Sequence, residues 1–477
     1  NPNGVIISHG PGNPNVYTEI VELINNEDKT VPLSVEVALD QIAALVDAIV
    51  EKLRVGVFGV GRGLHLAQCF MLCDAEIVAV CEKRSDRVAR AKEKLGENIA
   101  IYDNFDDFIK HDMDAVVLAN YANEHAPFAI RAMKAGKHVF SEVLPVQTMK
   151  EAVELVEAVE ESGLVYAYGE NYCYMPAPYE MMKLYRQGVI GEFEYGEGEY
   201  IHNCESIWHS ITYGEEDHWR NNMYATFYCT HSLGPIIHMT GLRPVSVVGF
   251  EGGMNQRNLR AGCKGGQFGI EMVTLENGGI VKSIHGGLYK NSIWYSVYGS
   301  KGRLECGRED AMDGHIGKLY INKDEYDGGY ETGSLNAVFP QHAPEGEVEG
   351  FGHGGSDFFS MYYFIKKILG DEDADTIDVY EALDMFLPGL FAYRSVMAGG
   401  IPLELPNLRD KAERDKWRND TTCTDPKAAG DMLLPTFSKG TPEIPQEVYD
   451  RMARLWDEEC GKTEGTYRSA ALSQGSK

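Results

Sequence analysis

The stretch Val55–Gly63, with the sequence VGVFGVGRG, decides the first half of the fold. Its apolar start is typical of a buried strand, and a helix-compatible sequence follows directly. Glycines at such a strand-to-helix turn let the backbone approach a pyrophosphate, which the helix N-terminus then stabilises. We therefore predict a dinucleotide-binding turn in which Gly59, Gly61, Arg62 and Gly63 contact the cofactor.

The residues after this turn indicate which dinucleotide binds. Leu64 replaces the usual third glycine of a G-x-G-x-x-G turn, and Gly63 stands one residue earlier. Glu82 ends the next apolar run, near the offset of roughly 20 residues at which an acidic side chain binds ribose hydroxyls. A carboxylate at this place repels a 2′-phosphate and favours NAD. Lys83 and Arg84 follow directly and leave NADP as the alternative, because a basic group can accommodate that phosphate.

The pattern around the turn predicts an α/β protein with two domains. Between residues 53 and 172, short apolar runs alternate with helical patterns, which predicts a doubly wound parallel sheet of the Rossmann type. From 173 to 408 the strand-like stretches are longer and alternate, so we predict an α+β domain with a large, mainly antiparallel sheet. Helical patterns return at 357–370 and 378–398.

Both ends of the chain lie outside these two domains. Residues 1–52 form a predicted N-terminal extension, with a Gly/Pro-rich turn followed by an amphipathic helix over 35–50. The turn resembles a loop of class I glutamine amidotransferases, but the chain has no cysteine in a nucleophile-elbow setting. Residues 409–477 are predicted to be an irregular C-terminal tail with one helix near 445–458.

Composition narrows the class of protein. The 477 residues are 44% hydrophobic, enough for two cores, and carry a formal charge of −28. This charge would repel nucleic acid and anionic membranes alike, so we expect neither as a partner. No apolar run has the length of a membrane span, and we expect a soluble, cytoplasmic protein. The ten cysteines are scattered, which predicts buried thiols rather than disulfides or a metal site.

With these residues placed, residues 53–408 resemble the Gfo/Idh/MocA oxidoreductases. The resemblance is carried by GVFGVGRG, by the loop NYANEHAPFAIRAMKAGKHVFSE, and by GGSDFFSMYYFIKKILG together with IPLELP. It implies that Asn120, Asn123, His125 and Glu142 lie along the dinucleotide, with a substrate cleft in the second domain close to the nicotinamide. It also implies a homo-oligomer.

Two departures from that family change the expected chemistry. Its dehydrogenases carry a Glu-Lys-Pro triplet whose lysine helps to remove the hydroxyl proton, whereas Val143 follows Glu142 here. The family also places an aspartate four residues before a histidine, and this chain has Phe227 before His231. Only the histidine is retained.

Both departures recur in a glycosidase branch, the NAD-dependent α-N-acetylgalactosaminidases, which the strings ENYCY (170–174) and THSLGP (230–235) resemble. This resemblance implies that Tyr174 and His231 are the acid/base groups. The strings SEVLPVQT, ENYCY and YCTHSLGP are also similar to gut-bacterial enzymes that oxidise the 3-hydroxyl of plant glycosides, including C-glycosides. Histidine suits a base because its intrinsic pKa lies near neutrality.

The segment 200–220 is the expected substrate cleft. It is rich in polar and aromatic side chains, a mixture that sugar clefts require. From it we select His202, Glu205, Trp219 and Arg220 as substrate residues. His202, His209 and Glu205 could instead be metal ligands, but the spacing is irregular and hydride chemistry needs no metal, so none is predicted.

Three hypotheses follow. The first is an NAD-dependent oxidoreductase that removes hydride from a sugar or glycoside, at the C3 hydroxyl, with Tyr174 and His231 as acid/base. The second is an NAD-retaining glycoside hydrolase that works by oxidation, elimination, hydration and reduction. The third, a cofactor-binding sensor, is disfavoured because both acid/base candidates are retained beside a cofactor turn.

Overall fold

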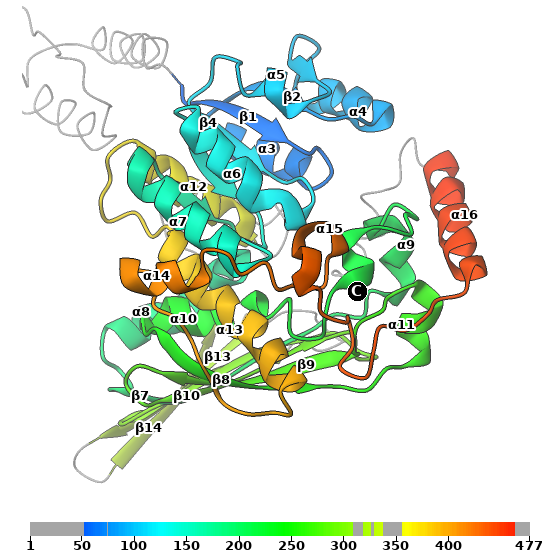
Figure 1. The fold of residues 1–477 in the computed structure, drawn as a ribbon. Helices are drawn as coiled ribbons and strands as arrows, with labels where there is room; N and C mark the ends of the chain where they lie inside the picture. Colours follow the sequence, from blue (N-terminus) through cyan, green and yellow to red (C-terminus); the bar gives the residue numbers. More distant parts are fainter. Residues whose placement is uncertain (1–51, 74, 309–317, 326–328, 337–354, 463–477) are drawn as a thin grey trace, which may run out of the picture.

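A computed structural model describes residues 52–73, 75–308, 318–325, 329–336 and 355–462 (Figure 1). The predicted N-terminal extension, apart from its last residue, lies outside these ranges, as do residues 463–477 of the tail. Within the described ranges, none of the helices combines the length and the apolar character that crossing a lipid bilayer requires.

The first domain contains a parallel six-stranded sheet in the order β3-β2-β1-β4-β5-β6. Its strands are β1 (Arg54–Phe58), β2 (Glu76–Cys81), β3 (Ala100–Tyr102), β4 (Ala115–Leu118), β5 (His138–Ser141) and β6 (Tyr166–Tyr168). The connecting helices are α3 (Gly63–Leu72), α4 (Ser85–Leu95), α5 (Phe105–Phe108), α6 (His125–Lys134) and α7 (Met149–Ser162). This order is the doubly wound arrangement predicted from the strand and helix alternation, and it opens a crevice where the strand order reverses between β1 and β4.

The second domain is built on a nine-stranded sheet in the order β14-β13-β12-β11-β7-β10-β9-β8-β15. All neighbours are antiparallel except β7 and β10, which confirms the predicted, mainly antiparallel sheet. The strands are β7 (Phe193–Ile201), β8 (Pro244–Glu251), β9 (Phe268–Leu275), β10 (Ile280–Gly286), β11 (Ser292–Gly299), β12 (Gly302–Cys306), β13 (Lys318–Glu325), β14 (Gly329–Asn336) and β15 (Leu403–Glu404).

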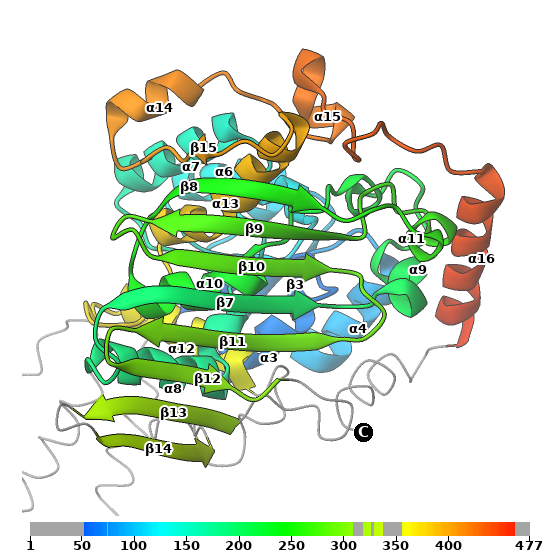
Figure 2. The ribbon, with the colours of Figure 1, turned by 90° about the horizontal axis from the view of Figure 1, so that it is seen from below.

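Helices cover only one face of the large sheet. The helices α8 (Pro176–Arg186), α10 (Thr230–Thr240) and α13 (Val379–Met397) lie between this sheet and the first domain (Figure 1). In the part of the chain that the structure describes, no helix lies over the opposite face, which Figure 2 views directly. The sheet is therefore a platform with one packed face and one open face.

The segment after the sheet returns to the first domain. Helix α12 (Ser356–Ile368) packs on α3, and three of its residues, Met361, Phe364 and Ile365, join the core cluster around β1. The predicted helices at 357–370 and 378–398 are α12 and α13. The helix predicted near 445–458 is α16 (Gln446–Lys462), which follows the shorter α14 (Lys411–Trp417) and α15 (Pro426–Ala429).

Four short elements supply residues to the frame of the site. They are the 3-10 turns η2 (Asn171–Tyr174) and η4 (Trp219–Asn222) and the small helices α9 (Trp208–Ile211) and α11 (Gln256–Ala261). Helix α16 contacts both α9 and α11, so the C-terminal tail borders the same region (Figure 1).

Candidate functional site: a dinucleotide turn beside a histidine-lined pocket

The glycine turn has the geometry that a dinucleotide needs. Gly59 has a φ of 86°, and a Cβ atom there would lie 2.6 Å from the carbonyl oxygen of Ala119. Gly63 begins α3, and a Cβ atom there would lie 2.8 Å from Cγ1 of Val57 in β1. Gly63 thus permits the close helix–strand packing that the third glycine of the usual turn provides. Although Gly63 stands one residue earlier than the usual third glycine, it still permits this packing of α3 on β1.

Glu82 lies directly after β2 and faces the turn. Its carboxylate accepts hydrogen bonds from the backbone N–H groups of Val60 (3.1 Å), Lys83 (2.9 Å) and Arg84 (3.0 Å). The Arg84 guanidinium lies over the rings of Trp456 (4.9 Å) and Tyr213 (5.2 Å). The Glu82 carboxylate is therefore at the turn, as NAD requires.

Arg62 is anchored by two carboxylates. Its guanidinium donates to both oxygens of Asp357, at 2.6 and 2.8 Å, and to Glu142 at 2.9 Å. Although burial opposes its charge, Asp357 and Glu142 raise the pKa of Arg62 above its usual value. Asp357 also accepts from the Asn171 amide at 2.7 Å and lies 3.1 Å from Nε2 of His65. One carboxylate at the start of α12 thus joins the glycine turn to η2.

The other residues expected along the dinucleotide differ in their positions. His125 donates from Nδ1 to the Leu144 carbonyl at 2.9 Å, and burial lowers the pKa of its ring. Its Nε2, like Oδ1 of Asn120, is buried without a hydrogen-bond partner among the described residues. These orphaned polar atoms and the glycine cradle fit a dinucleotide, because buried polar groups are normally satisfied. Asn123 instead donates to Asp425 at 3.1 Å, outside the pocket lining.

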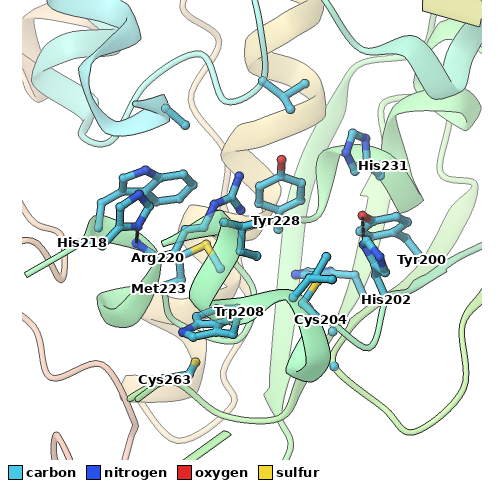
Figure 3. Close-up of a pocket in the computed structure, with 18 of the residues that line it drawn as sticks. Tyr200, His202, Cys204, Trp208, His218, Arg220, Met223, Tyr228, His231 and Cys263 are labelled. Atoms are coloured by element: carbon cyan, nitrogen blue, oxygen red, sulfur yellow. Dashed lines mark hydrogen bonds between the residues drawn. The ribbon is translucent and has the colours of Figure 1, made fainter. Parts of the chain in front are cut away.

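A pocket of about 620 Å³ lies between this region and the large sheet. It has the size of a small-molecule site. In the view of Figure 3, His218 and Arg220 lie on one side, His231, Tyr200 and His202 lie on the other, and Tyr228 stands between them. Of the residues expected to bind cofactor, the pocket is lined by Arg62, Asn120, His125 and Glu142.

His231 is held by a buried carboxylate. Its Nδ1 lies 2.7 and 2.9 Å from the two oxygens of Glu170, which is fully buried and also accepts from Thr230 Oγ1 (2.8 Å) and from the backbone N–H of Tyr172 (3.1 Å). Because an ionised carboxylate only accepts, Nδ1 carries the proton and Nε2 is left as the proton acceptor. This is the carboxylate–histidine arrangement that general bases use.

The sheet and three aromatic rings fix the place of His231. A Cβ atom on Gly198 of β7 would lie 1.8 Å from the Ser232 carbonyl oxygen, so a glycine there is what lets α10 lie directly on the sheet. The rings of Tyr172, Tyr200 and Tyr228 surround the imidazole, with centroids 4.3, 4.7 and 5.1 Å away. His231 is 6% exposed, and its ring therefore has little freedom to turn.

All four residues expected to bind substrate line this pocket. His202 is paired through Nδ1 with the Tyr200 hydroxyl at 3.0 Å. The Arg220 guanidinium lies 4.4 Å from the Trp219 ring centroid, which gives the wall a stacked cation and ring. The Glu205 carboxylate is bound to Arg260 of α11, so it braces the wall.

The structure does not bring Tyr174 to the pocket. Its hydroxyl donates to the Asp375 carbonyl at 2.6 Å, the residue is 1% exposed, and burial raises its pKa well above the usual value. Its ring packs instead near His238, which is paired with Asp375 and Glu381. The expectation that Tyr174 reaches the substrate is corrected here: η2 is a tight turn, and it directs Tyr172 to the pocket and Tyr174 into the core.

Several residues of the site were not selected from the sequence. Glu170 stood inside the quoted string ENYCY, and Asp357 stood inside GGSDFFSMYY, yet neither was given a role. A carboxylate in an otherwise apolar or aromatic string was the available signal, because such a group is buried only when it is paired. Tyr200 and Tyr228 carried no such signal, since tyrosines are numerous in this chain.

Comparison with known proteins places these observations in a family. Residues 53–170 match GFO_IDH_MocA, described as the oxidoreductase family with an NAD-binding Rossmann fold. A glycosyl hydrolase family 109 protein of Solibacter usitatus is 28% identical over 406 residues, which cover 76% of this chain and 89% of that protein. A protein of the same name from Saccharopolyspora erythraea is 25% identical over 415 residues, which cover 80% of this chain and 87% of that protein.

Solved structures share the fold. A myo-inositol 2-dehydrogenase from Lactobacillus plantarum has a TM-score of 0.59 at 19% identity, covering 74% of this chain and all of that one. A levoglucosan dehydrogenase, solved with NADH and levoglucosan, has a TM-score of 0.60 at 17% identity, covering 75% and 100%. The glycine turn, Glu82 at its side and the family match agree that NAD is the cofactor. In residues 53–170, the chain carries the NAD-binding Rossmann domain of the Gfo/Idh/MocA oxidoreductase family.

Proposed function

We propose that the protein is an NAD-dependent oxidoreductase that removes hydride from a secondary hydroxyl of a sugar or glycoside, at C3. The observation that carries this proposal is the Glu170–His231 pair, whose histidine lines the same pocket as the three tyrosines and as Arg62 of the glycine turn. The sugar-oxidising enzymes among the structural relatives, which share only the fold, are consistent with this class. Residues 53–172 would bind the cofactor, residues 173–408 the substrate, and the tail 409–477 would border both.

His231 is the base of this reaction. Its Nε2 takes the hydroxyl proton while the Glu170 carboxylate stabilises the imidazolium that forms. NAD, when bound, would supply the hydride acceptor for the carbon that bears this hydroxyl. His231 thereby takes the role of the lysine that the resembled family carries at the position of Val143. The valine makes the pocket lining apolar at this position.

Tyr228 takes the acid role that the sequence assigned to Tyr174. It lines the pocket 5.1 Å from the His231 ring, measured between centroids. Burial raises its pKa, although the neighbouring Arg220 lowers it. Tyr228 therefore keeps its proton at neutral pH and can donate a hydrogen bond to a sugar oxygen.

The cofactor contacts come from the turn and from the far side of the pocket. Gly59, Gly61 and Gly63 would receive the pyrophosphate, and Glu82 the adenosine ribose. His125 and Asn120, which line the pocket and each have a buried polar atom without a partner among the described residues, would contact the nicotinamide half. Arg62 and Glu142 are linked to each other and would order this edge of the site.

A second candidate function is an NAD-retaining glycoside hydrolase. It is favoured by the glycosyl hydrolase family 109 proteins that the chain resembles over most of its length. A ketone at C3 acidifies the neighbouring C2 proton, so elimination of the C1 substituent, addition of water and return of the hydride would complete hydrolysis without net oxidation.

One experiment separates the two functions. The purified protein is incubated with NAD and a panel of methyl and aryl glycosides, and ketosugar, NADH and free aglycone are measured. Ketosugar and NADH in equal amounts are expected for the oxidoreductase. Free aglycone without net NADH would overturn that proposal in favour of the hydrolase, and tight NAD binding without turnover of any sugar would refute both.

We also infer that the protein is a homo-oligomer formed through the open face of the large sheet. Aromatic and apolar side chains occur on this face among charged ones, and Tyr298 and Tyr320 there are 39% and 42% exposed. Light scattering is expected to give a mass above the monomer, and Tyr298→Glu is expected to lower it. A monomeric wild-type protein would refute the inference.

A further inference from the structure

A second carboxylate–imidazole pair lies on the inward face of the large sheet. Glu271 of β9 and His285 of β10 are 0% and 2% exposed, and Oε1 of Glu271 lies 3.5 Å from Nδ1 of His285. In the antiparallel register, Glu271 is opposite Ser283 and His285 is opposite Gly269, so the two side chains are diagonal neighbours on one face. The mechanism proposed above uses neither residue.

The polar atoms of this pair are unsatisfied within the protein. Both oxygens of Glu271 and both ring nitrogens of His285 are buried and form no hydrogen bond with any of the described residues. Burying such groups without partners costs about 1–3 kcal/mol each, and proteins keep few of them. By contrast, the Glu170–His231 pair has three donors on its carboxylate. The second pair therefore has hydrogen-bonding capacity that the described residues leave unused.

His285 lines the same pocket as His231. Strand β10 is the parallel neighbour of β7, and His285 is in register with Tyr200, whose ring centroid lies 4.7 Å from that of His231. Adjacent strands are about 4.8 Å apart, so His285 is one strand away from the tyrosine that touches the base. His231 and His285 are thus both neighbours of Tyr200 in the lining of one pocket.

We propose that His285, with the Glu271 carboxylate beside its Nδ1, binds a second hydroxyl group of the sugar, distinct from the hydroxyl that His231 deprotonates. Nδ1 faces Glu271, so Nε2 is the atom left for the ligand. This inference rests on the proposed sugar substrate and names the group that makes the site specific for a polyol rather than for a simple alcohol. An anion would be repelled by Glu271. Among the described residues, no three His, Cys, Asp or Glu side chains gather as metal ligands.

The test measures binding, so it needs no turnover. Calorimetry on the NADH-loaded protein compares methyl β-D-glucopyranoside with its 2-deoxy, 4-deoxy and 6-deoxy analogues, for the wild type, His285→Ala and Glu271→Gln. Loss of one hydrogen-bond partner from a buried site is expected to weaken binding of the parent glucoside about 10- to 100-fold in His285→Ala. The deoxy analogue that lacks the hydroxyl bound by His285 is expected to bind the wild type and His285→Ala with equal affinity.

The controls separate this inference from a folding defect and from the proposed function. His111→Ala, in the first domain, should leave all affinities unchanged, and His285→Asn keeps a polar group if the alanine variant fails to fold. Equal loss for the parent and every deoxy analogue, or no loss, would overturn the second hydroxyl site while leaving the proposed function intact. Binding of no glycoside to the wild type would contradict both.

Discussion

Replacing Glu170 with glutamine tests the carboxylate–histidine pair with the least disturbance of packing. The variant keeps an oxygen that can face both Nδ1 of His231 and the backbone N–H of Tyr172, so the histidine keeps its proton on Nδ1. What it loses is the negative charge 2.7 Å from the imidazolium that forms in the reaction. At an effective dielectric constant of about 20, that charge pair is worth about 6 kcal/mol.

A neutral amide dipole retains part of this interaction, so we expect the barrier to hydride transfer to rise by about 2–4 kcal/mol, which slows it roughly 30- to 1000-fold. Single-turnover formation of NADH, followed by its near-ultraviolet absorbance, measures this step. NAD affinity should stay at the wild-type value, because Glu170 contacts no part of the glycine turn in the structure. Glu157→Gln, which removes a carboxylate of α7 paired with Arg418 outside the pocket lining, is the matched control. A rate within about three-fold of the wild type in Glu170→Gln would refute the role of the pair in proton transfer.

Three further predictions concern the cofactor site and the core. Gly61→Ala should weaken NAD binding at least about ten-fold with little change in Tm. Gly63→Ala, whose new methyl group would meet β1, should lower the free energy of unfolding by about 1–3 kcal/mol. Equal Tm values for the two variants would contradict the role of Gly63 in packing α3 on β1. Trp456→Ala removes a ring that stacks on Arg84, which also lies over Tyr213 next to Gly61, and should speed NAD release about two- to five-fold in stopped-flow displacement; an unchanged release rate would show that α16 does not help to hold the cofactor. Burial opposes the charge on His238, but its two carboxylate neighbours raise its pKa to about 10, so its contribution to stability is complete below pH 6.5 and is lost as the pH rises toward about 10. Urea unfolding of His238→Asn should lack that decline, and an equal decline in both proteins would show that another group causes it.

The fold was predictable because its signals are local. The alternation of short strands and helices after Val55–Gly63 and the longer alternating strands after residue 173 each express a periodicity that the observed elements keep. His202, Trp219 and Arg220 line the pocket, and this could be predicted from the polar and aromatic types of these residues alone.

The site was predicted less completely because its geometry depends on distant contacts. The Arg62–Asp357 bond joins residues 295 positions apart, and no local pattern carries such information. Tyr172 and Tyr174 stand two positions apart on one 3-10 turn, so their opposite directions depend on how that turn is seated rather than on residue type. The Glu271–His285 pair needs the strand register, which fixes which inward side chains become neighbours.

The bond between Asp357 and Arg62 has a consequence for how the chain is made. The core around β1 is closed by Met361, Phe364 and Ile365, and the glycine turn is held by a carboxylate from the same helix. During synthesis, the first domain therefore cannot cover this surface or fix the glycine turn until α12 has been made. Nascent chains that end before α12 would expose that surface, and the domain would reach its final form only after α12 has left the ribosome.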